Sequence, residues 1–194
     1  MYSANLIMME RTEKQKMLAG ELYLANDFEL AADSKRASGL LRKYNSTTVE
    51  EAELRLQILK ELFGKVAAKI QIIPPFHCDY GSNIYVGNEF YMNYGCVIID
   101  CNTVHIGDNV KCAPYVQIYT AHHPTDPQIR QTKKELASPI NIGNNVWIGG
   151  GAIVCPGVSI GDNTTIGAGS VVVKDIPANV IAVGNPCKVI RSIS

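Results

Sequence analysis

The stretch "INIGNNVWIGGGAIVCPGVSIGDNTTIGAGSVVV", residues 140–173, decides the fold of this 194-residue chain. Branched apolar residues recur in it at a regular interval of six positions, and a small or apolar residue follows each of them four positions later. A fixed six-residue period is typical of a parallel β-helix, in which each hexapeptide forms a strand and a turn and three hexapeptides complete one coil. The anchors, which should point inward, are Ile142, Ile148, Val154, Ile160, Ile166 and Val172.

The same period continues upstream of this stretch. Two further runs of three anchors lie at residues 86–98 and 106–118, and the step of eight between them indicates an insertion of two residues. The sequences "IGDN" at 106–109 and "IGNN" at 142–145 place glycine and asparagine where the coil should turn, because these residues tolerate positive φ. A stack of repeats needs covered ends, and the C-terminal tail is suited to cover one of them.

The first 71 residues have a helical pattern instead. Apolar side chains recur at steps of three and four in residues 47–63, which predicts a helix that ends at Gly64. Residues 12–25 and 34–45 are predicted to form two more helices. We expect these helices to cap the other end of the stack.

The predicted organisation is a small α-helical N-terminal segment over residues 1–71 and a β-helix over residues 72–194. The six-residue period breaks once, at "IYTAHHPTDP" (118–127), where charged residues, proline and two adjacent histidines follow. We expect a loop over residues 120–140 that leaves the stack at a corner. A long loop on a rigid scaffold is a common position for functional residues.

Composition excludes some classes of function. Lys+Arg and Asp+Glu both number 18, so the formal net charge is zero and gives no general reason to bind nucleic acid or an anionic membrane. No stretch is apolar and long enough for a signal peptide core or a membrane span. Six cysteines without a C-x-x-C pair favour free thiols, no structural zinc site and a cytoplasmic location.

Four stretches carry a resemblance to a known family. "NNVWIGGGAIVCPGVSIGDNTTIGAGSVVVKDIPANVIAVGNPCKVIR" resembles the signature region of hexapeptide-repeat acyltransferases, and "MLAGELY", "CDYGSNIYVGNEFYMNYGCVIID" and "IYTAHHPTDP" resemble the maltose/galactoside O-acetyltransferase branch. The similarity covers residues 10–193, nearly the whole chain. It implies a left-handed β-helix, a homotrimer with sites at subunit interfaces, acetyl-CoA as donor and a sugar hydroxyl as acceptor.

The resemblance implies that His123, directly before Pro124, is the general base, and that Asn93 in "FYMNYG" is an acceptor-side residue that acts in catalysis. Acetyl transfer to a hydroxyl needs a base for the hydroxyl proton, and histidine suits that role. A residue before proline is extended, and neighbours in an extended segment face opposite ways. His122 should therefore face elsewhere. Glu135 is a candidate to orient the base, and no acyl-enzyme is needed.

The remaining site residues follow from the same resemblance. Asp27, Asp79 and Asn93 match or lie near acceptor-binding positions, whereas a second family acid falls at Cys101, which is a departure from the pattern. The backbone N–H of Gly150 is the candidate oxyanion donor. Basic residues near the C-terminus suit the phosphates of the donor. The residues expected to bind acetyl-CoA are Trp147, Gly150, Ala168, Lys174, Lys188 and Arg191.

Three alternatives remain open on the sequence alone. A hexapeptide-repeat enzyme could take an amine or antibiotic acceptor instead of a sugar. A zinc enzyme of the carbonic anhydrase type on the same architecture would use His105, His122 and His123, although adjacent histidines suit that geometry poorly and the transferase hypothesis requires no metal. A non-catalytic β-helical binding protein would neither bind acetyl-CoA nor depend on His123.

Overall fold

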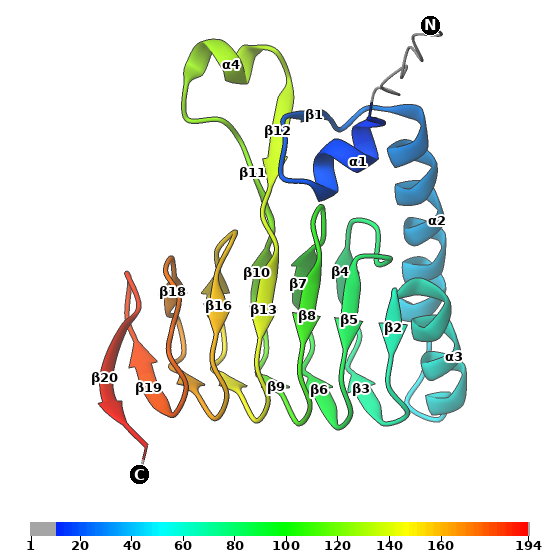
Figure 1. Ribbon diagram of the computed structural model, residues 1–194. Coiled ribbons are helices and arrows are strands. Elements are labelled where there is room, and N and C mark those ends of the chain that lie inside the picture. Colours follow the sequence, from blue (N-terminus) through cyan, green and yellow to red (C-terminus); the bar gives the residue numbers. More distant parts are fainter. Residues whose placement is uncertain (1–10, 194) are drawn as a thin grey trace, which may run out of the picture.

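The structure, a computed structural model that describes residues 11–193, is a parallel β-helix with helices packed against its N-terminal end (Figure 1). Its strands form three faces. Face 1 contains β2 (Lys65–Val66), β5 (Ile84–Val86), β8 (Val104–Ile106), β13 (Ile140–Ile142) and β16 (Ser159–Ile160). Face 2 contains β3 (Ile70–Ile72), β6 (Phe90–Met92), β9 (Lys111–Cys112), β14 (Trp147–Ile148), β17 (Thr165–Ile166), β19 (Val180–Val183) and β20 (Lys188–Ser192). Face 3 contains β4 (Phe76–Cys78), β7 (Cys96–Ile99), β10 (Gln117–Tyr119), β15 (Ile153–Val154) and β18 (Val171–Val172).

The predicted anchors form the core of this β-helix. Every anchor from Val86 to Val172 is buried, and so are the residues four positions after the later anchors. Parallel pairing joins equivalent positions of successive coils: Ile142 pairs with Ile160, eighteen residues on, whereas Ile84 pairs with Val104, twenty residues on. The hexapeptide repeat predicted from the sequence is therefore confirmed, including the two inserted residues.

Three corners connect the faces. The asparagine corner, between faces 1 and 2, contains residues 87–89, 107–109, 143–145, 161–163 and 177–179. The glycine corner, between faces 2 and 3, contains residues 93–95, 113–115, 149–151 and 167–169. The loop corner, between faces 3 and 1, contains residues 79–83, 100–103, 120–139, 155–158 and 173–175. Extra residues occur only at the loop corner among the described coils, because anchors elsewhere keep their six-residue step.

The N-terminal segment differs from its prediction at several boundaries. Helix α1 (Glu13–Leu18) is shorter than the predicted helix 12–25, because Gly20 has a φ of +72° and the chain then forms β1 (Tyr23–Leu24). Helix α2 (Phe28–Asn45) starts six residues before the predicted residue 34. Helix α3 (Ala52–Leu62) ends close to the predicted end but starts five residues after residue 47.

The first coil also begins earlier than residue 72. Strands β2 and β3 already pair with β5 and β6, so the β-helix starts at Lys65. Gly64 does not cap α3 in a left-handed conformation; it permits a close approach, because a Cβ there would lie 2.3 Å from the carbonyl oxygen of Ser82. Val66, Ile72 and Cys78 continue the six-residue step upstream of Val86, so the repeat extends one coil beyond the two runs identified at residues 86–118.

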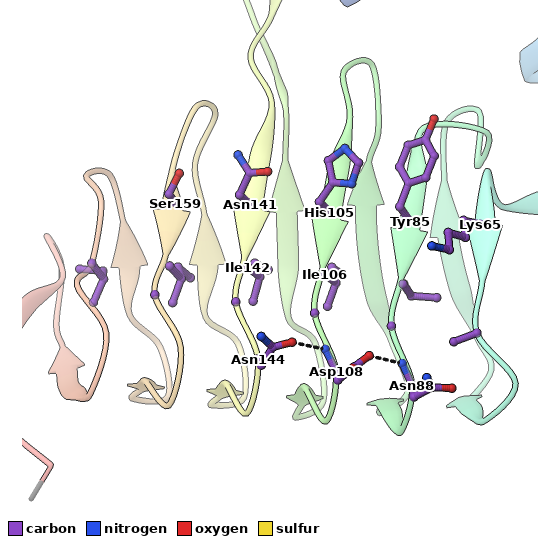
Figure 2. Close-up of a pocket in the computed structure, with 18 of the residues that line it drawn as sticks. Lys65, Tyr85, Asn88, His105, Ile106, Asp108, Asn141, Ile142, Asn144 and Ser159 are labelled. Carbon is purple, nitrogen blue, oxygen red and sulfur yellow. Dashed lines mark hydrogen bonds between the residues drawn. The ribbon is translucent and has the colours of Figure 1, made fainter.

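The asparagine corner is held by two ladders of hydrogen bonds. In the first, the N–H groups of Asn88, Asp108 and Asn144 each donate to the side-chain oxygen of the Asp or Asn one coil further on, at 2.6–2.8 Å (Figure 2). In the second, the side-chain amides of successive asparagines donate to each other at 2.8–3.0 Å. All four members of this second ladder have positive φ: Asn109, Asn145, Asn163 and Asn179.

Replacing Asn145 in this ladder should separate the two roles of the corner asparagines. Asn145→Ala loses both ladder bonds and must hold a φ of 56°, so we expect the free energy of unfolding to fall by about 2–3 kcal/mol. Asn145→Gly loses the bonds but tolerates the conformation, so its loss should be about 1 kcal/mol smaller. Urea unfolding of both variants measures the difference. Equal stability of the two variants would contradict a conformational role.

Candidate active site

The break in the repeat forms an arm that projects from the loop corner (Figure 1). It contains β11 (Ala121–His122), α4 (Pro127–Gln131) and β12 (Lys134–Ala137), and β12 pairs with both β11 and β1 in a three-stranded antiparallel sheet. The arm closes where the N–H of Ser138 donates to the carbonyl oxygen of Thr120 at 2.9 Å. The N-terminal segment therefore fixes the arm through β1.

Asn102 joins the arm, the coil and the N-terminal segment at one buried point. Its side chain is 3% exposed, and its Nδ2 donates to the carbonyl oxygens of Met17, Leu18 and Ala137 at 3.1–3.3 Å. Its backbone N–H donates to the hydroxyl of Thr120 at 2.9 Å. Because one amide side chain serves carbonyl groups of α1 and β12, the position of the arm depends on it.

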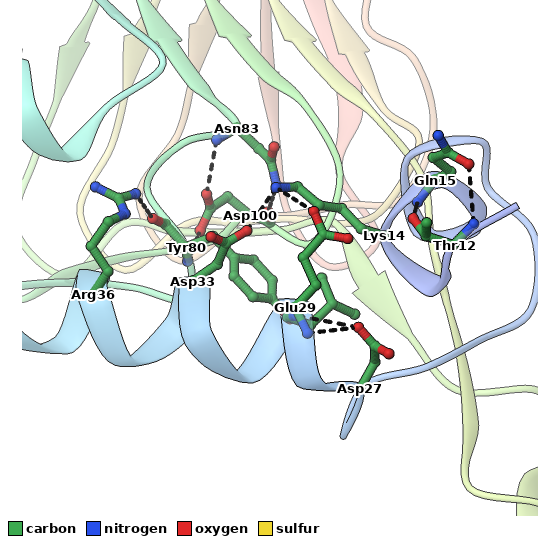
Figure 3. A network of polar contacts seen from close by, with 11 residues as sticks. Thr12, Lys14, Gln15, Asp27, Glu29, Asp33, Arg36, Tyr80, Asn83 and Asp100 are labelled. Atoms are coloured by element: carbon green, nitrogen blue, oxygen red, sulfur yellow. Dashed lines mark hydrogen bonds and ion pairs between the residues drawn. The ribbon is translucent and has the colours of Figure 1, made fainter.

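Asp100 fixes the preceding turn of the loop corner. Its carboxylate accepts hydrogen bonds from the backbone N–H groups of Asp79, Tyr80 and Asn83 at 2.9–3.3 Å (Figure 3). Burial raises the pKa of Asp100 to about 7, whereas the three N–H donors favour its charged form. Asp100 is fully buried, so it orients the turn that presents Asp79 and does not itself reach a ligand.

A cavity of about 600 Å³ lies between this turn, the arm and α2. Carboxylates of Asp79 and Glu135 line it together with the thiol of Cys101, so the structure brings together three residues that the sequence singled out. Helix α2 contributes small and polar side chains to the opposite wall. The full lining is Ala25, Leu30, Ala31, Ser34, Lys35, Ser38, Asp79, Tyr80, Cys101 and Glu135.

The polar groups of the cavity bond to one another. The Cys101 thiol donates to Oδ2 of Asp79 at 3.4 Å, and the buried Tyr23 hydroxyl donates to Oε2 of Glu135 at 3.3 Å. Burial raises the pKa of Asp79, the negative charge of Glu135 raises it further, and the bond from Cys101 opposes the rise. Burial also raises the pKa of Cys101, so this thiol is a neutral donor at ordinary pH.

The two histidines of the arm have different surroundings. His122 ends β11 and its Nε2 lies 3.4 Å from Oγ of Ser138. His123 is exposed, and the following Pro124 is buried with its carbonyl oxygen accepting from Arg130 at 2.9 Å. His122 is opposite Leu136 in the last pair of β11 and β12, and His123 follows directly after the end of β11.

Asp27 does not line the cavity. Its Oδ1 accepts the N–H groups of Glu29 and Leu30 at 2.9 and 3.4 Å, so Asp27 is the N-cap of α2 (Figure 3). Aspartate is among the residues most favoured at this position. The capping contact gives Asp27 a structural role in this chain, whereas Asp79 lines the cavity.

Three predicted residues lie together on the glycine corner: Asn93, Gly150 and Ala168. Asn93 Oδ1 accepts the N–H of Tyr94 at 2.8 Å, whereas its Nδ2 makes no hydrogen bond within residues 11–193. Gly149 and Gly151 donate to Ile166 and Pro114, whereas the N–H of Gly150 between them makes no backbone hydrogen bond in the described residues. A turn with an outward N–H group suits the stabilisation of an oxyanion.

Two of the predicted donor-binding residues on face 2, Trp147 and Arg191, lie in one row. Trp147 pairs with Thr165, Thr165 with Ile181, and Ile181 with Arg191, so Trp147 and Arg191 lie three strands apart, about 14 Å. Trp147 is 56% exposed and Lys188 lies on the same final strand as Arg191. Lys174, by contrast, lies on the loop corner, and the structure does not bring it to this row.

The predicted residues thus occupy different edges of one chain. His123 and Asp79 lie at the loop corner, whereas Asn93 and Gly150 lie at the glycine corner, on the other side of face 3. Sequence reasoning missed Asn102 and Tyr23, which position the arm and Glu135. The sequence signal for Asn102 is an asparagine at the two-residue insertion in the repeat. No local pattern indicates the role of Tyr23.

Three other features of the structure bear on the alternative functions. A larger hollow of about 920 Å³ follows face 1 and the asparagine corner, and contains none of the predicted site residues (Figure 2). Within residues 11–193, no group of three or more His, Cys, Asp or Glu side chains is arranged to hold a metal ion, and His105 stacks on Tyr85 with ring centroids 4.6 Å apart. In the same part of the chain, no helix combines the length and hydropathy that crossing a bilayer requires.

Comparisons with known proteins agree with this architecture. Residues 16–67 match the maltose acetyltransferase hexapeptide capping motif, and residues 139–174 match the bacterial transferase hexapeptide family of six repeats. Nodulation protein L of Rhizobium meliloti (strain 1021) is 54% identical over 93% of this chain and 99% of its own length.

Two solved structures are similar over nearly the whole fold. The maltose O-acetyltransferase from Clostridium difficile 630 is 53% identical with a TM-score of 0.94, covering 95% of this chain and 98% of its own. A galactoside acetyltransferase in complex with coenzyme A is 40% identical with a TM-score of 0.91, covering 95% and 92%. The chain therefore belongs to the maltose/galactoside O-acetyltransferase family of hexapeptide-repeat acyltransferases.

Proposed function

We propose that this acyltransferase moves the acetyl group of acetyl-CoA to a hydroxyl of a sugar, with His123 as general base. The observation that carries the proposal is the fixed arm. It carries the His-Pro pair, and its Glu135 lines with Asp79 a polar cavity whose carboxylates can accept hydrogen bonds from sugar hydroxyls. The similarity to a maltose O-acetyltransferase and to a coenzyme A complex supports the donor and the acceptor class.

The reaction is a direct transfer. His123 takes the proton of the sugar hydroxyl as its oxygen attacks the thioester carbonyl carbon, which forms a tetrahedral intermediate. The N–H of Gly150 donates to the developing oxyanion. The carbon–sulfur bond then breaks, and the CoA thiolate receives the proton held by the His123 imidazolium. The ester and CoA thiol are the products, and no covalent enzyme intermediate forms.

Glu135 orients the base in this proposal. It lies on β12, which pairs with β11 immediately before His123, and the Tyr23 hydroxyl donates to its Oε2. A carboxylate beside the imidazole selects one tautomer and stabilises the imidazolium formed on proton transfer. His122 contacts Ser138 and takes no part in the transfer.

A second chain completes the site. His123 at the loop corner and the oxyanion donor at the glycine corner lie on different edges of one molecule, so both can act on one substrate only if a neighbour supplies one of them. Face 3 offers the half-buried apolar side chains of Val97, Ile153 and Val171 for such a contact. These observations support a homotrimer with its sites between subunits, as the family resemblance implies.

Arg191 should hold the nucleotide end of the donor. Arg191→Ala removes the cation at the end of the Trp147 row, so we expect KM for acetyl-CoA to rise about tenfold, with KM for acetyl-pantetheine unchanged because it lacks the nucleotide phosphates. Lys111→Ala is the matched control, since Lys111 flanks Trp147 on the opposite side of the same row. An equal loss with both donors would contradict the assignment.

An acceptor panel tests the proposed function as a whole. Release of CoA is measured with maltose, glucose, galactosides and small amines, and mass spectrometry with mild alkaline hydrolysis distinguishes an ester product from an amide. The proposal expects ester formation on a sugar. Amide formation on an amine with no sugar ester would instead select the amine-acceptor alternative.

A further inference from the structure

The negative charge of the cavity under the arm is not balanced by ion pairs. Asp79 and Glu135 line the same space, and burial raises the pKa of Asp79, with a smaller rise from the negative charge of Glu135. Each carboxylate receives a hydrogen bond from a neutral group, the Cys101 thiol or the Tyr23 hydroxyl. None of the ion pairs found within residues 11–193 includes either carboxylate.

Lys14 and Arg36 have partners outside this cavity, and Lys35 lies at its rim. Lys14 pairs with Glu29 and Asp33 at 3.3 and 2.7 Å. Arg36 donates to two backbone carbonyl oxygens, those of Glu61 and Tyr80, at 3.0 and 3.1 Å. Lys35 lines the cavity from the exposed side of α2 and has no ion-pair partner among the described residues. The inner wall is therefore acidic and the outer rim carries the cation.

We infer that Asp79 and Glu135 act as a charge filter on the acceptor, which admits uncharged sugars and excludes anionic ones such as sugar phosphates. The inference rests on the proposed function, because it takes this cavity as the acceptor side. An anionic group brought beside partly buried carboxylates meets like charge in a medium of reduced dielectric. An uncharged hydroxyl can instead donate to both carboxylates.

Cys101 makes this filter possible in its present form. A thiol holds Asp79 in place without neutralising its charge, whereas a cation in that position would cancel it. The family resemblance implies an acid at this position. Because this chain has Cys101 there, the cavity wall contains two acids, Asp79 and Glu135, and not three. Asp79 is thus the specificity-determining residue that can be changed without altering the proposed His123–Glu135 pair.

The experiment compares methyl glucoside with glucose 1-phosphate, which share their remaining hydroxyls and differ in charge at the anomeric position. For the native enzyme we expect kcat/KM for the phosphate to be at least about 100-fold lower. In Asp79→Asn the difference in kcat/KM between the two acceptors should become about tenfold smaller, because the substitution removes one negative charge and keeps the shape of the side chain. Glu50→Gln, an equal charge change outside the cavity, should leave the ratio unchanged.

Salt provides a readout that a steric filter would not give. Raising the ionic strength from about 0.05 to 0.5 M screens the charges. The difference in kcat/KM between the two acceptors should therefore become smaller for the native enzyme, and it should change less for Asp79→Asn. Equal use of both acceptors by the native enzyme would overturn the charge filter and leave the proposed function intact. Discrimination unaffected by Asp79→Asn and by salt would also overturn it. Absence of transfer to any sugar would overturn both proposals.

Discussion

Replacing His123 by alanine lowers kcat for acetyl transfer about 10³-fold, because the substrate hydroxyl loses its proton acceptor. Binding of acetyl-CoA stays within about twofold, since the residues proposed for the donor lie on face 2 and the glycine corner, apart from the arm. Steady-state CoA release gives kcat, and isothermal titration with CoA gives the affinity. The combination separates loss of chemistry from loss of fold.

His122→Ala is the control for this variant. It removes an imidazole from the adjacent position, where the ring contacts Ser138, so kcat should remain within about threefold of the native value. The same solvent exposure of the two histidines makes the pair well matched. Full activity of His123→Ala, or a greater loss in His122→Ala, would reject the assignment of the base.

Asn102→Leu has the largest expected effect on stability. The change keeps the side-chain volume but leaves the carbonyl oxygens of Met17 and Ala137 without their buried donor, so we expect the free energy of unfolding to fall by about 3 kcal/mol. Because those carbonyl groups belong to α1 and β12, the arm should also lose its fixed position. We expect kcat to fall about tenfold or more in the folded variant, from the misplacement of His123.

Two further variants serve as controls for Asn102→Leu. Asn141→Leu makes the same substitution on the exposed surface of β13 and should change stability by less than about 0.5 kcal/mol. Asn102→Asp keeps the shape and the acceptor oxygen but removes the donor, so it should lose activity as Asn102→Leu does. Chemical denaturation and CoA release measure the series. A stable and fully active Asn102→Leu would show that the arm is held by other contacts.

Sequence periodicity predicted the β-helix because its core is a local repeat. An anchor such as Ile142 is specified by the residues six positions away, and no long-range information is needed to place it inside. The arm was predictable for the converse reason, since charged residues and proline cannot continue the inward pattern. Asp79, for which the resemblance implies an acceptor-side role, lines the cavity under the arm.

Contacts between distant segments could not be predicted in this way. Asn102 bonds to a helix 85 residues earlier in the chain, and Tyr23 bonds to Glu135 across 112 residues. The resemblance implies an acceptor-side role for Asp27, and the structure shows that its carboxylate caps α2. The predicted start of that helix, residue 34, lies six residues after Phe28 and therefore does not reveal the cap. A residue type alone does not distinguish a capping carboxylate from a binding one.

The loop corner determines where the sequence of this chain can gain or lose residues during evolution. Successive anchors across that corner are separated by eight, eight, twenty-four, six and four residues, whereas anchors across the other two corners keep a separation of six. Insertions and deletions are thus absorbed at one edge while every strand keeps its partner and its inward side chains. New segments, whether natural or engineered, can be inserted at the loop corner of a single coil while the other coils stay unchanged.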